Sequence, residues 1–293
     1  MTRTIRIRKG ADIRLKGRPS PQVEQASSAP LYAVKPPNYQ GIVPKLEVKE
    51  GAAVKAGSTL FHSKEHPEVK FLSPVSGTVK QVVRGEKRRI LAVVVEADGK
   101  NDQHAFASVD PATTDREALV AAVAERGFFA FIEQRPFATV ANPTDVPRSI
   151  HVSGFDSAPL AADMEVALAG REAAFQTGIH ALRVLAGGSN VQLGTKAGQT
   201  FFNAIEGVDT FTFEGPHPTG NAGVQIHHTR PINKGEVVWT MHAEDVANLG
   251  ETLSSGTYCA TRVVAVAGSE CDAPRHLQTT LGCAISTLVG SVN

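Results

Sequence analysis

Binding of NADH or a flavin would require a glycine-rich turn that leads a strand into the N-terminus of a helix, where the phosphates sit. The chain contains no G-x-G-x-x-G and no G-x-x-x-x-G-K-[ST] sequence. Gly187 and Gly188 follow a predicted helix and precede a predicted strand, which is the reverse order and is typical of a helix end. The sequence therefore disfavours a dinucleotide or flavin site in this chain.

Metal binding is a candidate because five histidines fall within one region, but none of the five stands four residues from another: His180, His217, His227, His228 and His242. His227 and His228 are adjacent in a predicted strand and would point to opposite faces, so they could not hold one ion together. The three cysteines, at 259, 271 and 283, form no C-x-x-C, which disfavours zinc, an iron–sulfur cluster and a disulfide framework. We expect no metal and a reducing environment.

Two short segments combine residue types that suit a flat organic ligand. Glu214–Gly220 holds two prolines and two glycines around His217, which would fix one imidazole in place. Glu133–Phe137 places Arg135 beside aromatic residues, an arrangement that suits a carbonyl-bearing quinone head group. The alternatives are a stiff crossover between strands for the first segment, and a core helix that ends in an exposed arginine for the second.

The segment Gly41–Gly99 consists of short apolar runs separated by glycines, which indicates a compact all-β unit. Its phrases VKEGAAVKAGSTLF and SPVSGTVKQV resemble the flattened barrel of biotinyl and lipoyl carriers. In such carriers the modified lysine stands eight positions before the proline that corresponds to Pro74, and His66 occupies that position here. Neither Lys64 nor Lys70 takes its place, so a structural barrel is favoured over a carrier.

The elements that would position these residues follow from hydrophobic periodicity and turn signals. A short alternating strand opens the chain, and a helix is predicted from Asp115 to Gly127. The rest predicts an open α/β sheet, with strands at Ser149–Ser153, 191–193, Val224–Thr229 and 236–241, and helices at about 164–178 and 179–186. Beyond residue 255 a strand begins a small α+β unit, which we expect to continue in a longer native chain.

Composition sets the outer limits. The 293 residues predict two or three domains, and the net charge of +1 gives no overall attraction to nucleic acid. The N-terminus lacks the apolar core of a signal peptide. The most apolar stretch, Ala118–Ile132, is interrupted and shorter than the roughly 20 residues needed to span a bilayer, so any membrane attachment would come through a partner.

Several strings occur in an order that resembles one family along nearly the whole chain. They are I-x-I-x-K-G (Ile5–Gly10) with Asp12 and Gly17, R-G-E-K-R (Arg84–Arg88), Q-R-P-F (Gln134–Phe137), G-P-H-P-x-G (Gly215–Gly220), I-H-H (Ile226–His228), V-V-W-T (Val237–Thr240) and V-V-A-V-A-G-S (Val263–Ser269). By these strings the chain resembles the NqrA family, which belongs to the sodium-pumping NADH:quinone oxidoreductases.

The resemblance implies a peripheral subunit on the cytoplasmic face of the bacterial inner membrane. It would belong to a complex that passes electrons from NADH to ubiquinone and expels sodium ions. Flavins and iron–sulfur clusters would belong to partner subunits. This chain would support assembly, and its main neighbour would be the membrane quinone-reductase subunit. No catalysis by the chain alone is expected. The alternative is an electron-transfer subunit that binds flavin or NADH itself, like RnfC or the flavin-binding subunit of complex I.

The resemblance also implies three domains: a barrel-sandwich β domain at 1–100, a Rossmann-like α/β domain at 101–255, and the start of a β-grasp domain at 256–293. The family has been associated with quinone binding. The residues we expect near a quinone are Tyr39, Gly41, Arg135, Phe137 and His217.

Overall fold

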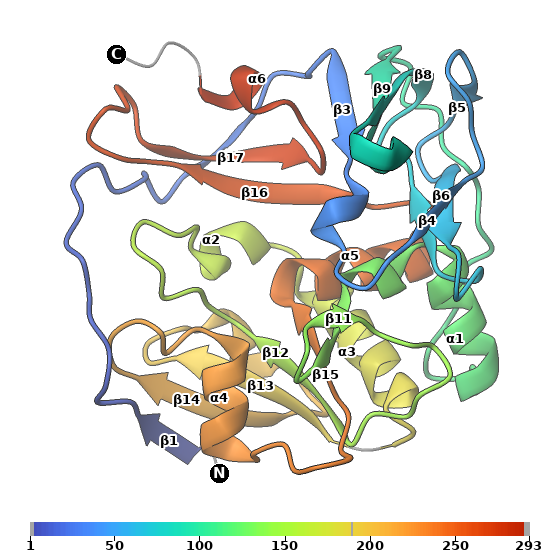
Figure 1. The fold of residues 1–293 in the computed structure, drawn as a ribbon. Helices are drawn as coiled ribbons and strands as arrows, with labels where there is room; N and C mark the ends of the chain where they lie inside the picture. The colour runs from blue at the N-terminus through green and yellow to red at the C-terminus, as the bar shows by residue number, and fades with distance from the viewer. Residues whose placement is uncertain (1–2, 189, 290–293) are drawn as a thin grey trace.

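The computed structural model describes residues 3–188 and 190–289, and within them the strands form four sheets (Figure 1). Two small sheets build the β barrel, a seven-stranded sheet forms the centre of an α/β unit, and a three-stranded sheet lies beside both. Most buried apolar side chains belong to one continuous core that runs from the barrel into the α/β unit.

The barrel consists of a four-stranded sheet, ordered β3-β9-β8-β5, and a three-stranded sheet, ordered β4-β6-β7. Valines alternate along the two long strands, and Val79, Val93 and Val95 point into a core shared with Phe61 and Phe71. The compact all-β unit predicted for Gly41–Gly99 is confirmed. Its elements are β3 (Leu31–Val34), the 3-10 helix η1 (Pro36–Asn38), β4 (Pro44–Leu46), β5 (Ala53–Val54), β6 (Thr59–Ser63), β7 (Lys70–Leu72), β8 (Gly77–Arg84), η2 (Glu86–Arg88) and β9 (Ile90–Ala97).

The central sheet has the order β1-β14-β13-β12-β15-β10-β11. The first five strands of that order run parallel, and β10 and β11 are antiparallel to their neighbours. The strands are β1 (Arg3–Arg6), β10 (Ile132–Arg135), β11 (Thr139–Val140), β12 (Ser149–Ser153), β13 (Val191–Lys196), β14 (Asp209–Glu214) and β15 (Val238–His242), and a 3-10 helix, η4 (Phe201–Ala204), lies between β13 and β14.

Helices cover both faces of this sheet. On one face Ile150 and Val152 of β12 join the core with α3 (Glu172–Leu185) and α5 (Ala243–Ser255). On the other face His151, the residue between them, hydrogen-bonds Gln225 of α4 (Ala222–Thr229). The open α/β sheet predicted from the sequence is confirmed.

Three of the predicted elements are wrong. Val224–Thr229 was predicted as a strand but forms α4, and β14, which was not predicted, takes the position in the sheet. The adjacent residues Gln225 and Ile226 are both buried, which a half-buried strand does not allow but a helix between sheet and loop does. The segment before Arg135 is not a core helix: the 3-10 helix η3 (Phe128–Phe131) leads directly into β10.

The third error concerns where the helices after residue 163 divide. The first helix, α2 (Met164–Leu168), stops at once because Gly170 adopts a left-handed φ of +77°. Gly178, the predicted break, lies inside α3, where α5 crosses it. By contrast, α1 (Arg116–Glu125) begins at an Asp115 cap and ends before Gly127, as predicted.

The N-terminal residues do not join the barrel. β1 pairs with β14 at the edge of the central sheet, and β2 (Val23–Gln25) pairs with β17 (Arg275–Thr280) in the three-stranded sheet β16-β17-β2. That sheet also holds β16 (Thr261–Val266), and α6 (Ile285–Val289) follows it. The sequence had suggested that residues 1–100 form one domain. Among the described residues, no helix combines the length and apolar character needed to cross a membrane.

Candidate functional site

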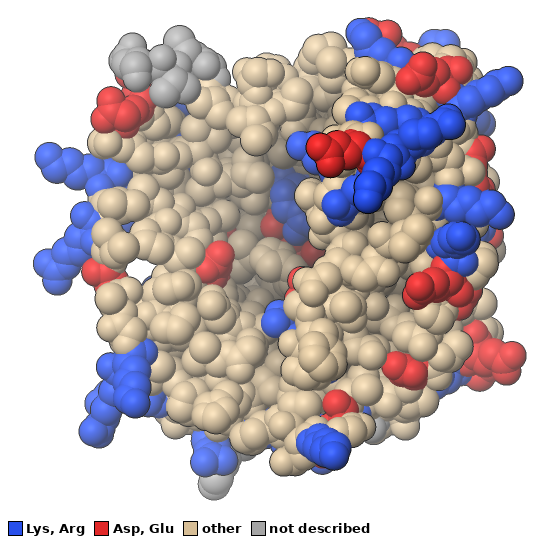
Figure 2. Space-filling model, in the orientation of Figure 1, with Lys and Arg blue, Asp and Glu red and all other residues tan. Residues whose placement is uncertain are grey.

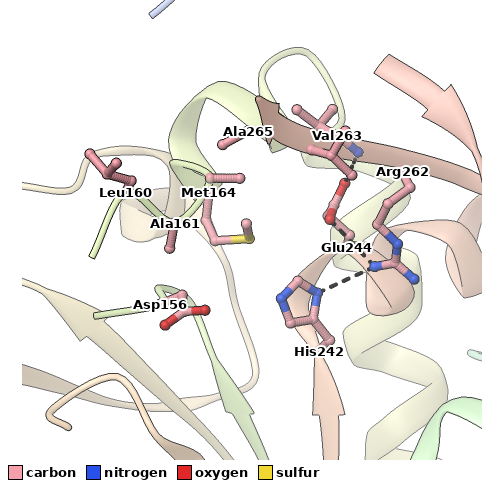
Figure 3. A pocket seen from close by; sticks show the side chains of 11 residues that line it. Asp156, Leu160, Ala161, Met164, His242, Glu244, Arg262, Val263 and Ala265 are labelled. Carbon is pink, nitrogen blue, oxygen red and sulfur yellow. Dashed lines mark hydrogen bonds and ion pairs between the residues drawn. The ribbon is translucent and has the colours of Figure 1, made fainter. Parts of the chain in front are cut away.

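The chain changes direction across the central sheet between β12 and β15. From β12 it proceeds through α3 to β13 on one side, whereas β15 lies on the other side, so the carboxyl ends of the two strands adjoin at Ser153 and His242. Open α/β sheets bind ligands in the crevice at such a point. A cleft of about 360 Å³ opens there (Figure 3). We call it the edge cleft.

The two walls of the edge cleft differ in character. The loop after β12 and the start of α2 supply Leu160, Ala161 and Met164, together with the exposed carboxylate of Asp156. The opposite wall carries an imidazole, a carboxylate and a guanidinium that lie close together in Figure 3: His242, Glu244 and Arg262. Residues 263–265 of β16 complete the lining.

The polar wall is an ion cluster that the chain completes by itself. Arg262 Nη2 lies 2.5 Å from Asp245 Oδ1, and its Nη1 lies 3.4 Å from Glu244 Oε2 and 3.5 Å from His242 Nδ1. The second oxygen of Glu244 accepts a hydrogen bond from the backbone N–H of Val263 at 2.7 Å. Burial lowers the pKa of Arg262, but the two carboxylates outweigh that effect and the pKa is raised.

This cluster occupies the position that a dinucleotide would need. Glu244 and Asp245 stand in the first turn of α5 and are 1% and 6% exposed, so two buried carboxylates already complement the positive end of the helix dipole. A pyrophosphate placed there would meet two negative charges whose guanidinium partner is already engaged. The residues present do not fit a dinucleotide or flavin phosphate at α5.

The turn after β12 is closed as well. A side chain at Gly154 would place its Cβ 2.7 Å from the ring of Phe202, so this glycine makes room for an aromatic ring of the same chain. The short helix that follows is capped by Asp163, which accepts a hydrogen bond from the N–H of Glu165 at 3.0 Å. Both turns at the carboxyl edge are thus occupied by side chains of this protein.

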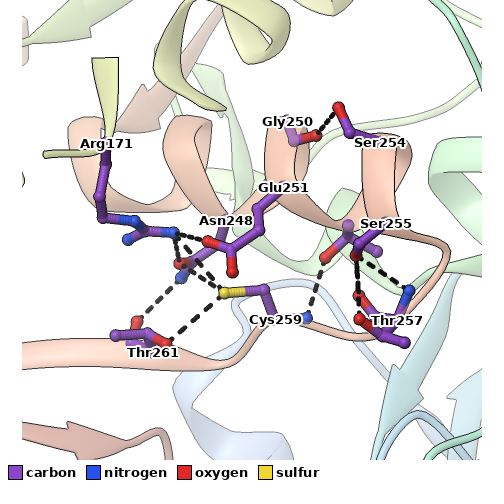
Figure 4. Close-up of polar contacts among 10 residues, drawn as sticks. Arg171, Asn248, Gly250, Glu251, Ser254, Ser255, Thr257, Cys259 and Thr261 are labelled. Carbon is purple, nitrogen blue, oxygen red and sulfur yellow. Dashed lines mark hydrogen bonds and ion pairs between the residues drawn. The ribbon is translucent and has the colours of Figure 1, made fainter. Parts of the chain in front are cut away.

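Beside the edge cleft, a second polar cluster joins α3, α5 and β16 (Figure 4). Arg171 Nη2 lies 2.9 Å from Asn248 Oδ1, 2.7 Å from Glu251 Oε2 and 3.6 Å from Cys259 Sγ. Burial raises the pKa of the Cys259 thiol, which keeps it protonated and a poor nucleophile. The role of this cluster is to fix the elements around the cleft.

Four of the five predicted quinone-proximal residues lie around the β10–β11 hairpin. Phe137, at its tip, is 76% exposed, and Arg135 Nη2 forms an ion pair with Glu133 Oε2 at 2.8 Å. Gly41 lies against Thr139 of β11, while the half-buried ring of Tyr39 contacts Phe71 of the barrel edge to face.

His217 lies apart from the other four. It follows the carboxyl end of β14, whereas Arg135 pairs with Val238 at the amino end of β15, so the two residues are at opposite edges of the sheet. Its Nδ1 lies 3.0 Å from Ser157 Oγ, which also accepts a hydrogen bond from the N–H of Gly220. The predicted five therefore do not form one site.

The residues of the edge cleft were not predicted. An acidic pair directly after a strand does mark a helix start, and H-A-E-D at 242–245 follows V-V-W-T-M. However, nothing in the sequence indicates that Arg262 folds back onto that pair. Among the histidines, His227 and His228 lie on α4 rather than in a strand, with ring centroids 5.1 Å apart. Within residues 3–188 and 190–289, no three potential ligands gather as a metal site would require.

Comparison with known proteins adds a family to this geometry. Residues 5–98 match the family model described as the NqrA N-terminal barrel-sandwich hybrid domain, and residues 114–258 match the NqrA second alpha/beta domain. Three relatives from Saccharophagus degradans, Rhodopirellula baltica and Pseudomonas aeruginosa carry the name of the first (A) component of Na(+)-translocating NADH-quinone reductase, and each is 34% identical over 97% of this chain. The chain spans 63–64% of their length, a little under two thirds.

Proposed function

The chain belongs to the NqrA family, and from that premise we propose that it is a peripheral subunit of a sodium-translocating NADH:quinone reductase. Its role is to support assembly, and it carries no flavin or nicotinamide of its own. Those groups and the iron–sulfur clusters belong to partner subunits, and the partner that holds it at the cytoplasmic face of the inner membrane is the membrane quinone-reductase subunit.

One observation carries the proposal. At the edge cleft, where an α/β scaffold of this kind would hold its cofactor, Glu244 and Asp245 fill the helix N-terminus and Arg262 neutralises them. The strand order β14-β13-β12-β15 supports a Rossmann-like assignment for this unit, because it reproduces the 3-2-1-4 order of that fold. The scaffold is retained while its phosphate position is self-occupied.

We assign the three-stranded sheet with α6 to the start of a β-grasp unit. In the family, that unit would continue along the remaining third of the relatives' length. The boundaries near residues 100 and 255 belong to the same proposal, except that β1 and β2 pair outside the barrel.

We further propose that the β10–β11 hairpin is the part of this chain that lies close to ubiquinone. Phe137 offers an exposed ring at the hairpin tip, and the Arg135 guanidinium lies two residues away on β10. Tyr39 and Gly41 flank the same hairpin, whereas His217 would be too remote to share that contact.

Two measurements separate this proposal from a flavin- or NADH-binding subunit. The purified chain should show no flavin absorbance in the visible range and no NADH binding by calorimetry. When mixed with solubilised membranes, it should recover an integral membrane quinone reductase. Flavin absorbance that persists after gel filtration would favour the RnfC-like alternative.

The quinone contact has its own test in the assembled complex. Phe137→Ala should raise the KM for ubiquinone several-fold and leave the KM for NADH unchanged, because only the first substrate would touch the hairpin. Leu91→Ala removes another exposed apolar side chain, on β9 of the barrel, and should change neither constant. Equal ubiquinone kinetics in the Phe137 and Leu91 variants would remove the hairpin from the quinone path.

A further inference from the structure

The connection between β1 and β2 holds an exposed segment that the proposed function does not use. Residues 10–17, which we call the strap, climb one side of the molecule from the central sheet toward the three-stranded sheet (Figure 1). Ile13 is 64% exposed and Leu15 is 54% exposed, although both are large aliphatic residues. In Figure 2 a small opening separates part of this margin from the body of the molecule.

Both ends of the strap are fixed by close backbone contacts. A Cβ on Gly10 would lie 2.0 Å from His217 O, and a Cβ on Gly17 would lie 2.1 Å from Gly268 O. Ala11 N donates to His217 O at 3.0 Å, and Gly268 N donates to Gly17 O at 3.0 Å. Asp12 accepts from the backbone N–H of His217. The strap is thus anchored at its ends while its middle faces solvent.

The strap and its flanks are strongly cationic. Five basic residues lie within eleven positions: Arg8, Lys9, Arg14, Lys16 and Arg18. None of the five forms an ion pair among the described residues, and the one acidic residue between them, Asp12, is engaged with the His217 loop. Since the whole chain has a net charge of only +1, the positive charge is concentrated here. Figure 2 shows cationic side chains projecting along the corresponding margin.

We propose that the strap is a docking surface for an anionic phospholipid bilayer. Ile13 and Leu15 would enter the interfacial region while the flanking cations meet the lipid phosphates. An apolar pair or a cluster of cations alone binds membranes weakly, but together they provide the two signals that reversible attachment requires.

An acidic polypeptide is the other candidate partner, and the geometry favours it less. Such a ligand needs a groove or a free strand edge, whereas the edge cleft and the hollow beside the end of β16 are lined by residues 156–164, 242–244 and 262–289, outside the strap. The backbone of the strap also turns tightly at Arg14, where Leu15 N donates to Ile13 O, which breaks the extended edge that a peptide strand would pair with. A bilayer surface adapts to a convex segment and needs neither feature.

The test is co-sedimentation of the full 293-residue chain with vesicles of phosphatidylcholine mixed with phosphatidylglycerol, or of phosphatidylcholine alone. We expect binding to the anionic vesicles only, and a loss of that binding as the salt concentration rises. The double variant Arg14→Glu/Lys16→Glu should lower the partition coefficient about tenfold or more, because each cation near the surface contributes about 1 kcal/mol. Ile13→Ser/Leu15→Ser should lower it several-fold.

The matched control reverses two exposed cations on the barrel. Lys87→Glu/Arg88→Glu changes the net charge by the same amount as the strap variant but should keep most of the binding. In a separate Leu15→Trp variant, anionic vesicles should shift the new fluorescence to shorter wavelength, whereas the native Trp239 is buried and serves as a constant background. Thermal melting checks that every variant is folded.

Three results would overturn the proposal: no binding of the wild-type chain to anionic vesicles, equal losses in the strap and barrel variants, or an unshifted Leu15→Trp spectrum. Capture by an acidic polypeptide without vesicle binding would assign the strap to the other class of partner. The proposal is independent of whether the chain lies near ubiquinone, since none of these measurements involves quinone or NADH.

Discussion

At the residue scale, Arg262 holds together the polar wall of the edge cleft. Arg262→Met would leave Glu244 and Asp245 buried without their counter-charge, and removal of one partner from such a cluster typically costs several kcal/mol. Because Arg262 keeps 19% of its side chain exposed, we expect a loss of about 3 kcal/mol in the free energy of unfolding at pH 7, measured in urea.

The loss in Arg262→Met should shrink as the pH falls from neutral into the acid range. Without the guanidinium the carboxylates acquire raised pKa values, and an acid whose pKa is raised in the folded state favours folding below that pKa. Lys80→Met breaks an exposed pair with Glu96 and should cost less than about 0.5 kcal/mol at either pH. A deficit that stays constant with pH would mean that the carboxylates find another cation.

Tyr39 makes stability sensitive to alkali. Burial first, and then the charge of Asp245, raise its pKa to about 12, with Arg262 acting in the opposite sense. Because the unfolded phenol ionises near pH 10, this residue favours the folded state below pH 10 and loses that effect as the pH rises toward 12. Tyr39→Phe should therefore unfold like the wild type at neutral pH but lose about 1–2 kcal/mol less stability across that alkaline range. Parallel curves for the two proteins would place the phenol in contact with water.

At the scale of elements, α3 and α5 approach each other through two glycines. A Cβ at Gly250 would lie 1.9 Å from Ala174 O, and one at Gly178 would lie 2.1 Å from Val246 O, so the helices can be this close only where no side chain intervenes. Gly250→Ala should destabilise the protein by about 2–3 kcal/mol in urea.

The control for that helix contact is Gly223→Ala. Gly223 lies in α4 with nothing within 4 Å of the added Cβ, so alanine should raise stability by up to about 1 kcal/mol. Opposite signs for the two variants would identify helix contact, rather than glycine content, as the determining factor. Two destabilised variants would argue against it.

Local patterns predicted the elements whose signals are local. The turn glycines and alternating valines of the barrel, and the Asp115 cap and Gly127 stop of α1, gave elements that the structure contains. The α4 segment failed because V-Q-I-H-H-T has β-branched residues and alternation, and only the position of His151 makes it favourable to bury Gln225 from a helix. Arg262 was missed for a similar reason, because its partners lie 17 and 18 residues earlier on another element.

At the scale of the whole molecule, the chain closes on itself between its ends. β1 pairs with β14, so that Arg6 lies opposite Glu214, and β2 pairs with β17. Pairings between strands so distant in sequence leave no periodic signal in either strand, which is why the sequence suggested that residues 1–100 form one unit. The barrel is consequently flanked by segments that belong to the other two sheets.

This closure predicts how the N-terminus contributes to stability. A chain that begins at Lys9 would lose β1 and also Ile7, which is 5% exposed and packs with Phe155 and Phe213. The free energy of unfolding of the α/β unit should fall by about 3 kcal/mol, as for removal of a large buried aliphatic side chain. Hydrogen exchange should become faster at β14, which then becomes the edge of the sheet, and remain unchanged at β8 and β9 of the barrel. Arg3→Ala, which leaves the strand in place, should change neither region, and faster exchange in the barrel of the shortened chain would show that the N-terminal residues support that domain after all.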